Sequence, residues 1–201
     1  MKQMNLIGLI RQKAENCEYL AGLAAKNTSV PAEILDGVKS PEATVKYKCI
    51  KILRILSVET PAALYPCFGF FAELLDGKNN ILKWNAIDII SNLTAVDLED
   101  RFGAMFAKYY SLLEEGSLIT AAHVVESSPV IIKYKPEMEN RITTTLFSIE
   151  KIPLPTEECR DILRGKLILA FSRYVDTSQN KAGMLEYAGW VVSRKQIRPA
   201  T

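Results

Sequence analysis

Apolar residues recur along this chain at the spacing of an amphipathic helix. The clearest case is segment 41–58, where five apolar residues stand at i, i+4, i+7, i+8 and i+11 and so share one helical face: Val45, Cys49, Ile52, Leu53 and Leu56. Basic residues occupy the other faces: Lys46, Lys48, Lys51 and Arg54. The pattern predicts a helix with one buried side and one solvated side.

Proline and glycine mark where these helices are expected to begin and end. Ser40-Pro41-Glu42 predicts a start, with a capping hydroxyl, Pro at the first helical position and an acid near the positive helix end. Thr60-Pro61 predicts a second start. Asp76-Gly77 is expected to end that second helix, because Gly adopts the left-handed conformation that terminates helices. The apolar stripe between these two points consists of Leu64, Phe68, Phe71 and Leu75.

Period-2 alternation bounded by hairpin turns is nearly absent, so no sheet is expected. The stretch VIIKY within residues 127–138 is the nearest candidate for a strand, but a single strand has no partner. Residues 127–138 are therefore predicted to hold the end of one helix, a loop, and the start of another helix after Pro136.

The prolines at 153 and 155 are expected to break the chain again. Thr156, followed by two glutamates, predicts the start of a helix that reaches about Tyr174. A last helix is predicted over residues 179–195, and residues 198–201 are expected to form a tail.

The apolar pattern repeats when the chain is shifted by 37 residues. This shift aligns three successive segments, as in Val45 with Leu82 and Ile119, Lys46 with Lys83 and Thr120, and Cys49 with Ala86 and His123. The expected turns follow at similar intervals: Asp36-Gly37, Asp76-Gly77 and Glu115-Gly116. Each unit is predicted to be two antiparallel helices that cannot bury their apolar face alone, so stacked units would form a solenoid.

Residues 74–93, LLDGKNNILKWNAIDIISNL, resemble a HEAT repeat hairpin, of the armadillo-like class of helical repeats. Residues 34–56 resemble it with a longer turn. The resemblance implies an all-α fold, a right-handed α-α superhelix of about five hairpins whose second helices line a concave face. It also implies ladders between a turn Asp and a basic residue of the next helix, as in Asp36 with Lys46 and Asp76 with Lys83. Thr120 departs from this pattern in the third unit.

The resemblance is clearest for residues 31–95, fair for 96–128 and least for 136–195. We therefore expect one HEAT-like domain over residues 1–197, in which residues 1–30 form a capping helix or a divergent first repeat.

The composition is that of a folded protein without a strong charge bias. Of 201 residues, 48% are apolar and 24% charged, which suffices for a core and a solvated surface. The net charge of +2 does not by itself indicate nucleic acid or an anionic membrane as partner. No apolar run approaches the length of a membrane span, and no signal peptide is recognised. Four separated cysteines, none in a CxxC pair, are expected to be reduced thiols of a cytoplasmic protein.

Few residues are candidates for catalysis or metal binding. The chain contains no phosphate-binding, dinucleotide-binding, GxSxG or HExxH motif. His123 is the single histidine, and its alignment with Cys49 and Ala86 predicts a packed or partly buried side chain. With one histidine, a zinc site is not expected. The acidic pairs near helix ends, Glu114-Glu115, Glu157-Glu158 and the group Asp97, Glu99 and Asp100, are expected to cap helices or face water. No catalytic residue, metal or cofactor is therefore predicted.

The favoured function is a non-enzymatic protein-interaction scaffold or regulatory subunit, in which second helices form a preformed groove for a peptide or protein. The predicted contact residues are Tyr47, Lys48, Lys51, Arg54, Trp84 and Asp88. Trp190 on the last helix is a further candidate anchor for a partner. A subunit that acts only inside a complex would have the same sequence features.

Nucleic-acid binding is the alternative. The DNA glycosylases that remove alkylated bases are HEAT-like solenoids of similar length with a cationic concave face, aromatic residues and an Asp. Trp84 stands next to Lys83 with Asp88 one turn later, and basic residues with aromatics suit phosphate and base contacts. Those enzymes are usually richer in Trp and Arg, and their catalytic Asp motif is not recognised here.

Overall fold

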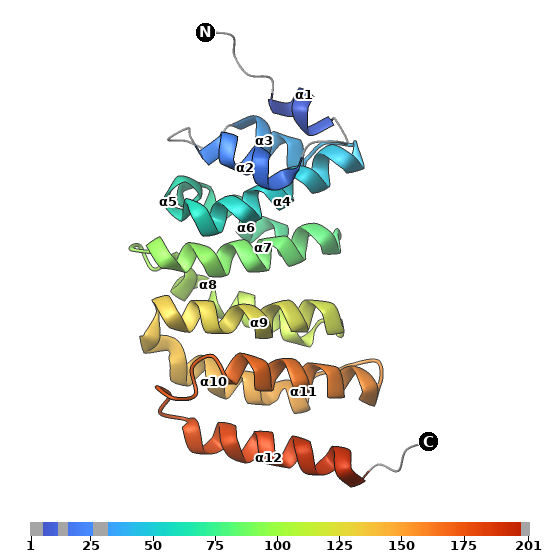
Figure 1. Cartoon of the computed structure of the whole chain (residues 1–201), viewed down its shortest axis with the longest axis vertical. Coiled ribbons are helices and arrows are strands. Elements are labelled where there is room, and N and C mark those ends of the chain that lie inside the picture. Colours follow the sequence, from blue (N-terminus) through green and yellow to red (C-terminus); the bar gives the residue numbers. More distant parts are fainter. Residues whose placement is uncertain (1–5, 12–15, 26–31, 198–201) are drawn as a thin grey trace. The chain divides into compact units, whose positions relative to one another are not determined.

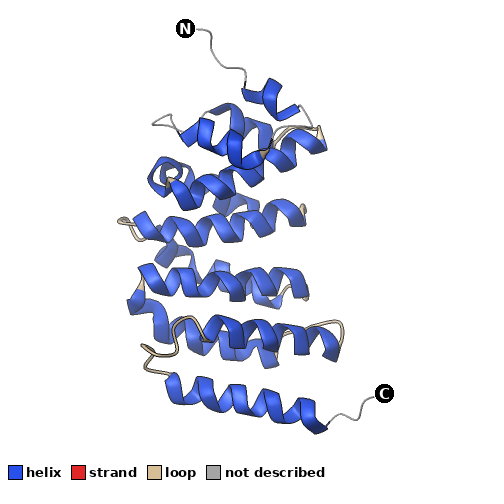
Figure 2. Cartoon of the chain, viewed as in Figure 1, coloured by secondary structure: helices blue, strands red, loops and turns tan. Residues whose placement is uncertain are grey.

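The computed structural model describes residues 6–11, 16–25 and 32–197. Every regular element in these ranges is a helix and none is a strand, so the all-α prediction is confirmed (Figure 2). The chain divides into two compact units, Met1–Met105 and Phe106–Thr201. The single domain over residues 1–197 and the superhelical arrangement stay predictions, and the tail at 198–201 lies outside the described residues.

The first unit is built around two long helices, α4 (Ala43–Glu59) and α7 (Asn80–Leu93), which pack against each other (Figure 1). Its other elements are α1 (Leu6–Arg11), α2 (Cys17–Ala25), α3 (Ala32–Val38), α5 (Pro61–Leu64), η1 (Tyr65–Cys67), α6 (Phe68–Leu74) and η2 (Thr94–Val96). α8 (Arg101–Ser111) continues from the first unit into the second.

The second unit contains α9 (Leu118–Tyr134), which packs against α11 (Glu157–Phe171). Its other elements are η3 (Leu112–Glu114), η4 (Pro136–Met138), α10 (Glu139–Phe147), η5 (Ser148–Glu150) and α12 (Lys181–Ile197). In both units, no described helix has the combination of length and hydropathy that crossing a membrane requires.

The predicted apolar faces are buried. In α4, the five residues of the predicted face are all buried, and the stripe in 64–75 is buried as well. That second segment is not one helix, however, because η1 interrupts it between α5 and α6. Pro66 lies in η1, and its missing N–H cannot continue an α-helical ladder.

The repeat interval grows along the chain, which corrects the alignment of the third unit. The N-cap residues Glu42, Asn79, Ser117 and Thr156 follow at intervals of 37, 38 and 39 residues. A uniform shift of 37 wrongly places Ile119 in the core, although half of its surface is exposed. His123 is only half-buried, and the buried Val124 occupies the position equivalent to Ala86. Gly116, at φ +75°, is a residue of the turn that precedes α9.

Three predicted boundaries differ from the structure. α4 begins at Ala43 rather than Pro41, and the Ser40 hydroxyl accepts a hydrogen bond from the backbone N–H of Glu42 over 3.1 Å. Asp36-Gly37 lies inside α3, where Gly37 packs against Cys49, so the turn comes later. Gly77 is not left-handed, because the chain after α6 closes with a bond from its N–H to the carbonyl of Leu74 over 3.2 Å.

The predictions for the C-terminal part agree more closely. α9 ends at Tyr134 and η4 starts at Pro136, as expected for residues 127–138. The Thr156 side chain caps α11 by accepting from the N–H of Cys159 over 3.2 Å, as predicted, although α11 ends at Phe171. α12 covers most of the predicted last helix.

Candidate functional site

The six predicted contact residues lie on two neighbouring helices. Tyr47, Lys48, Lys51 and Arg54 belong to α4, and Trp84 and Asp88 belong to α7. The two helices pack against each other, and the apolar residues of both are buried. The polar residues on the remaining faces are consequently brought beside one another, as the repeat alignment predicted.

Polar contacts tie the two helices together along this row. Arg54 donates from Nη1 to Oδ2 of Asp88 over 3.3 Å. Asn79, the N-cap of α7, donates from Nδ2 to the Tyr47 hydroxyl over 3.2 Å. Further along, Asn92 donates to the Ser57 hydroxyl over 2.9 Å. We name eight residues the α4–α7 row: Tyr47, Lys48, Lys51, Arg54, Ser57, Trp84, Asp88 and Asn92. Ser57 is buried, and the other seven are half-buried or exposed.

Two features of this surface escaped sequence reasoning. Nζ of Lys51 lies 4.0 Å from Oε1 of Glu18 on α2, so an acid of another helix partly balances its charge. The Asn79–Tyr47 bond was also missed, although Asn79 directly precedes the apolar pattern of α7 and is a favoured N-cap residue. Trp84 is half-buried one turn before Asp88, which leaves part of its ring accessible.

The α4–α7 row carries an excess of positive charge. The row contains three basic residues, Lys48, Lys51 and Arg54, and one acidic residue, Asp88. Arg54 pairs with Asp88, and Lys51 approaches Glu18 of α2. The Arg54–Asp88 pair is only partly shielded, with 44% and 20% of the two side-chain surfaces exposed. Such a pair orders the side chains more than it stabilises the fold. The surface therefore suits an acidic partner.

The predicted ladder of Asp36 with Lys46 and Asp76 with Lys83 stays a prediction. Only 7% of the surface of Lys83 is exposed, which is unusual for lysine. Its aliphatic stem therefore packs within the unit.

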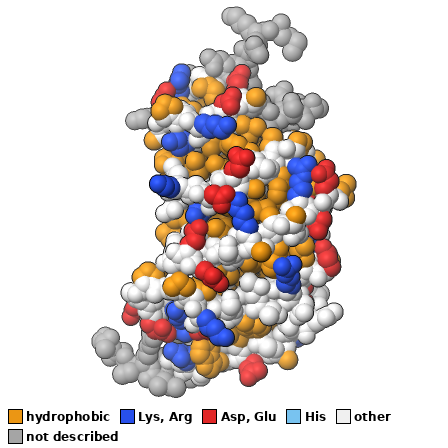
Figure 3. All heavy atoms as spheres, turned by 180° about the vertical axis from the view of Figure 1, so that it is seen from behind, with side chains coloured by type: hydrophobic (Ala, Val, Ile, Leu, Met, Phe, Trp, Pro, Cys, Tyr) orange, Lys and Arg blue, Asp and Glu red, His pale blue; other side chains and the backbone are white. Residues whose placement is uncertain are grey.

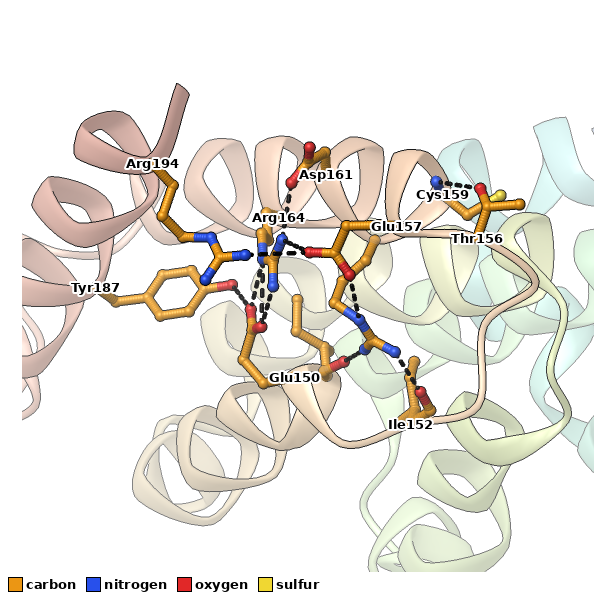
Figure 4. Close-up of polar contacts among 11 residues, drawn as sticks. Glu150, Ile152, Thr156, Glu157, Cys159, Asp161, Arg164, Tyr187 and Arg194 are labelled. Atoms are coloured by element: carbon orange, nitrogen blue, oxygen red, sulfur yellow. Dashed lines mark hydrogen bonds and ion pairs between the residues drawn. The ribbon is translucent and has the colours of Figure 1, made fainter. Parts of the chain in front are cut away.

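A second cluster, which the sequence did not reveal, surrounds Arg164 on α11 (Figure 4). Arg164 is 3% exposed and donates to three carboxylates. Its Nε lies 3.0 Å from Oε1 of Glu150, and its Nη1 lies 2.6 Å from Glu157 and 2.7 Å from Asp161. Hydrogen bonds to Glu150, Glu157 and Asp161 outweigh burial and raise the pKa of Arg164, so this group stays charged.

The same cluster joins three elements of the second unit. The Tyr187 hydroxyl of α12 donates to Glu150 over 2.7 Å, and Arg194 of α12 donates to Glu157 over 3.3 Å. Arg160 donates to the carbonyls of Ile149 and Ile152 over 2.6 and 2.9 Å, which holds the segment before α11 in place. Burial alone would raise the pKa of Glu150, but the bonds from Arg164 and Tyr187 lower it.

Sequence spacing could have found only part of this cluster. Asp161 and Arg164 stand at i and i+3 on one helix, which is a recognisable pair. Glu150 is 14 residues from Arg164, beyond the prolines at 153 and 155, and no local pattern relates them. Glu157 stays largely exposed, yet its carboxylate pairs with arginines rather than with water alone.

Of the two roles expected for Asp97, capping a helix or facing water, the structure shows the first. Asp97 is 8% exposed and caps α8, with its carboxylate accepting from the backbone N–H groups of Arg101 and Phe102 over 2.9 and 3.0 Å. The Tyr65 hydroxyl also donates to it over 2.6 Å. Asp97 is thus a structural residue that joins η1 to the start of α8.

Metal ligands do not gather in the described part of the chain: no group of three His, Cys, Asp or Glu side chains there could hold an ion. Cys17 and Cys49 are buried, whereas Cys67 and Cys159 are half-buried, and all four are free. Burial, with a smaller contribution from neighbouring Cys17, raises the pKa of Cys49 to about 11, so this thiol is a core group and not a nucleophile.

Comparisons with protein-family models, with curated protein sequences and with solved structures found no match to this chain.

Proposed function

We propose that this protein is a non-enzymatic interaction scaffold or regulatory subunit, and that the α4–α7 row binds an acidic segment of a protein partner. The observation that carries the proposal is the cross-helix tethering of the row. Arg54 to Asp88 and Asn79 to Tyr47 hold side chains of two helices in one arrangement before any partner arrives. Binding to a pre-arranged surface loses less side-chain entropy than binding to a loose one.

The remaining side chains supply what a peptide site needs. Lys48 and Lys51 offer ammonium groups, and the half-buried Tyr47 and Trp84 offer aromatic area beside them. Tyr, Trp and Arg are the residues that most often dominate interface energies. A HEAT-like repeat would present such second helices on its concave face, which is the part of the proposal that rests on the resemblance. In this proposal the protein works in the cytoplasm, where its four free cysteines would stay reduced.

The test is partner capture with matched charge reversals. Lys51→Glu with Arg54→Glu reverses two charges on the row, and Lys78→Glu with Lys151→Glu reverses two exposed charges elsewhere. Proteins that wild type and the Lys78/Lys151 variant retain, and the Lys51/Arg54 variant loses, support the proposal. Circular dichroism of each variant checks that it is folded. Equal capture of the same partners by all three proteins would contradict the proposal.

A different probe of the same surface distinguishes the nucleic-acid alternative from the proposal. Fluorescence anisotropy with labelled duplex and single-stranded DNA at about 50 and 200 mM salt spans the range in which phosphate contacts lose affinity steeply. The proposal expects no binding at either salt. Steeply salt-dependent binding that the Lys51/Arg54 variant abolishes would replace it with a nucleic-acid function, including a glycosylase. The ion pair of Asp88 with Arg54 favours a structural role for this carboxylate over a catalytic one. On the face of the molecule that Figure 3 shows, positive and negative side chains are interspersed.

A further inference from the structure

An aromatic pocket opens in the second unit, among residues that are not part of the α4–α7 row. Its volume is about 350 Å³, within the range of small-ligand sites. Five residues line it: Phe147 at the end of α10, and Gly183, Glu186, Tyr187 and Trp190 of α12. Trp190 keeps 39% of its surface exposed, and the other two rings are half-buried.

The three rings are set at angles that make a concave wall. Tyr187 lies between the others, with ring centroids 5.7 Å from Phe147 and 5.7 Å from Trp190. The planes of Phe147 and Tyr187 meet at 64°, and those of Tyr187 and Trp190 at 40°. The rings do not stack flat on one another, and all three residues line the same pocket.

Gly183 keeps this space open. A Cβ built at Gly183 would lie 3.7 Å from Cζ of Phe147, so any longer side chain would extend into the pocket. Gly183 lies in the first turn of α12, where φ is not positive and no backbone requirement calls for glycine. A larger residue would therefore fill the pocket without straining the helix.

One carboxylate at the pocket is not part of an ion pair among the described residues. Glu186 is exposed and has no ion-pair partner among the described residues. Behind the rings, the cations Arg160, Arg164 and Arg194 are matched by the anions Glu150, Glu157 and Asp161. Glu186 is thus an exposed carboxylate at the pocket that can attract a cation.

The aromatic rings are suited to the same kind of ligand. Tyr187 donates its hydroxyl proton to the Glu150 carboxylate over 2.7 Å, and a phenol that donates to an anion has a more electron-rich ring. The ring centroid of Trp190 lies 5.2 and 4.9 Å from the guanidinium carbons of Arg164 and Arg194. Cation–π contacts thus already form at this indole within the protein.

We propose that the pocket of Phe147, Gly183, Glu186, Tyr187 and Trp190 binds a small organic cation of the methylated-ammonium class. A methylated ammonium spreads its charge over apolar methyl groups and is weakly hydrated, so aromatic faces can replace its water. The Glu186 carboxylate supplies the long-range attraction. This binding site is independent of the partner-binding surface proposed above, and either proposal can fail alone.

The experiment compares choline with its uncharged carbon isostere, 3,3-dimethylbutan-1-ol, by isothermal titration calorimetry on the full chain. The two ligands have nearly the same shape, so the difference in affinity isolates the charge. We expect choline to bind about tenfold more tightly or better, from cation–π and carboxylate attraction. Equal affinities for the two ligands would overturn the proposal. So would the absence of heat with both ligands at millimolar concentration, if the trimethyllysine peptide described below also fails to bind.

Variants locate the binding. Glu186→Gln should weaken choline binding about fivefold, the loss of one partly screened charge. Glu137→Gln, at an exposed acid outside the pocket, should leave it unchanged. Gly183→Val should abolish binding by filling the space, and amide NMR spectra that keep their dispersion would show that the variant is folded. Choline binding that survives both Glu186→Gln and Gly183→Val in folded protein would place the ligand elsewhere and refute the assignment.

A second pair of ligands identifies the source of the cation. A short peptide with one trimethyllysine is compared with the same peptide carrying unmodified lysine. Binding of the methylated peptide, without choline binding, would assign the pocket to a modified protein side chain. Choline binding alone would assign it to a free small molecule. Preference for unmodified lysine would contradict the methylated-ammonium class.

Discussion

Arg54 and Asp88 stand 34 residues apart in the chain and join α4 to α7 through a 3.3 Å ion pair. The pair lies in the middle of the α4–α7 row. Its register follows from the 37-residue interval between the N-caps Glu42 and Asn79, because Asp88 lies one turn before the residue equivalent to Arg54. The pair thus follows from the spacing of α4 and α7 along the chain.

A double-mutant cycle should give this pair a small coupling energy. Arg54→Ala, Asp88→Ala and the double variant are expected to show about 0.2–1 kcal/mol of coupling in urea unfolding, because both side chains contact solvent. Added salt should reduce the coupling. The matched control is the 2.7 Å ion pair of Lys166 on α11 with Glu126 on α9. Its coupling energy should be similarly small and should also fall with salt. A coupling above about 2 kcal/mol would show that the pair is desolvated, contrary to its exposure.

Stability should fall with acid through the Arg164 cluster. Hydrogen bonds from Arg164 and Tyr187 overcome the effect of burial and hold the pKa of Glu150 below its ordinary 4.5. A depressed carboxyl pKa contributes stability that is fully present above the unfolded pKa and is lost as pH falls through the folded pKa. We therefore expect the urea midpoint to drop as pH is lowered from about 5 towards 3. Ser178, Thr143 and Asn180 lower the pKa of Glu139 against its own burial, so Glu139 acts in the same direction.

Glu150→Gln isolates the contribution of the cluster. The variant should lose about 1.5–3 kcal/mol at pH 7, the range for hydrogen bonds to charged groups, and its stability should depend less on pH below 5. Glu114→Gln, at an exposed acid in η3, should change neither quantity. A Glu150→Gln protein with the wild-type pH profile would show that the acid sensitivity arises elsewhere.

Gly37→Ala should destabilise the first unit, because a methyl group there would overlap Sγ of the buried Cys49. We expect a loss of about 1–3 kcal/mol, typical of overpacking. Gly165→Ala in α11 is the matched control: apart from its chain neighbours and the backbone of its own helix, no atom lies within 4 Å of the added methyl group. That variant should gain about 0.5–1 kcal/mol from helix propensity.

Combining Gly37→Ala with Cys49→Ala tests the cause. Removing the sulfur leaves room for the methyl group, so the double variant should be more stable than the sum of the two single changes predicts. Thermal unfolding followed by circular dichroism measures all four proteins. Strict additivity would mean that Gly37 is required for a reason other than its contact with Cys49.

The sequence alone determined the helical class, the buried face of α4 and the cap of α11. These features depend on local spacing: Val45, Cys49 and Leu56 share a face because of the 3.6-residue period, and the Thr156 side chain reaches an N–H only three residues away. The neighbouring positions of Arg54 and Asp88 could also be predicted, because the repeat interval relates α4 to α7.

Tertiary structure alone decided the contacts that no period encodes. Arg164 meets Glu150 across a proline-containing segment, and Tyr187 reaches the same carboxylate from α12. The lengthening of the repeat interval from 37 to 39 residues moved His123 out of the core position that a constant interval assigned to it. Such contacts depend on how loops return the chain and on which side chains then exclude water together, and hydrophobic periodicity carries no information about either.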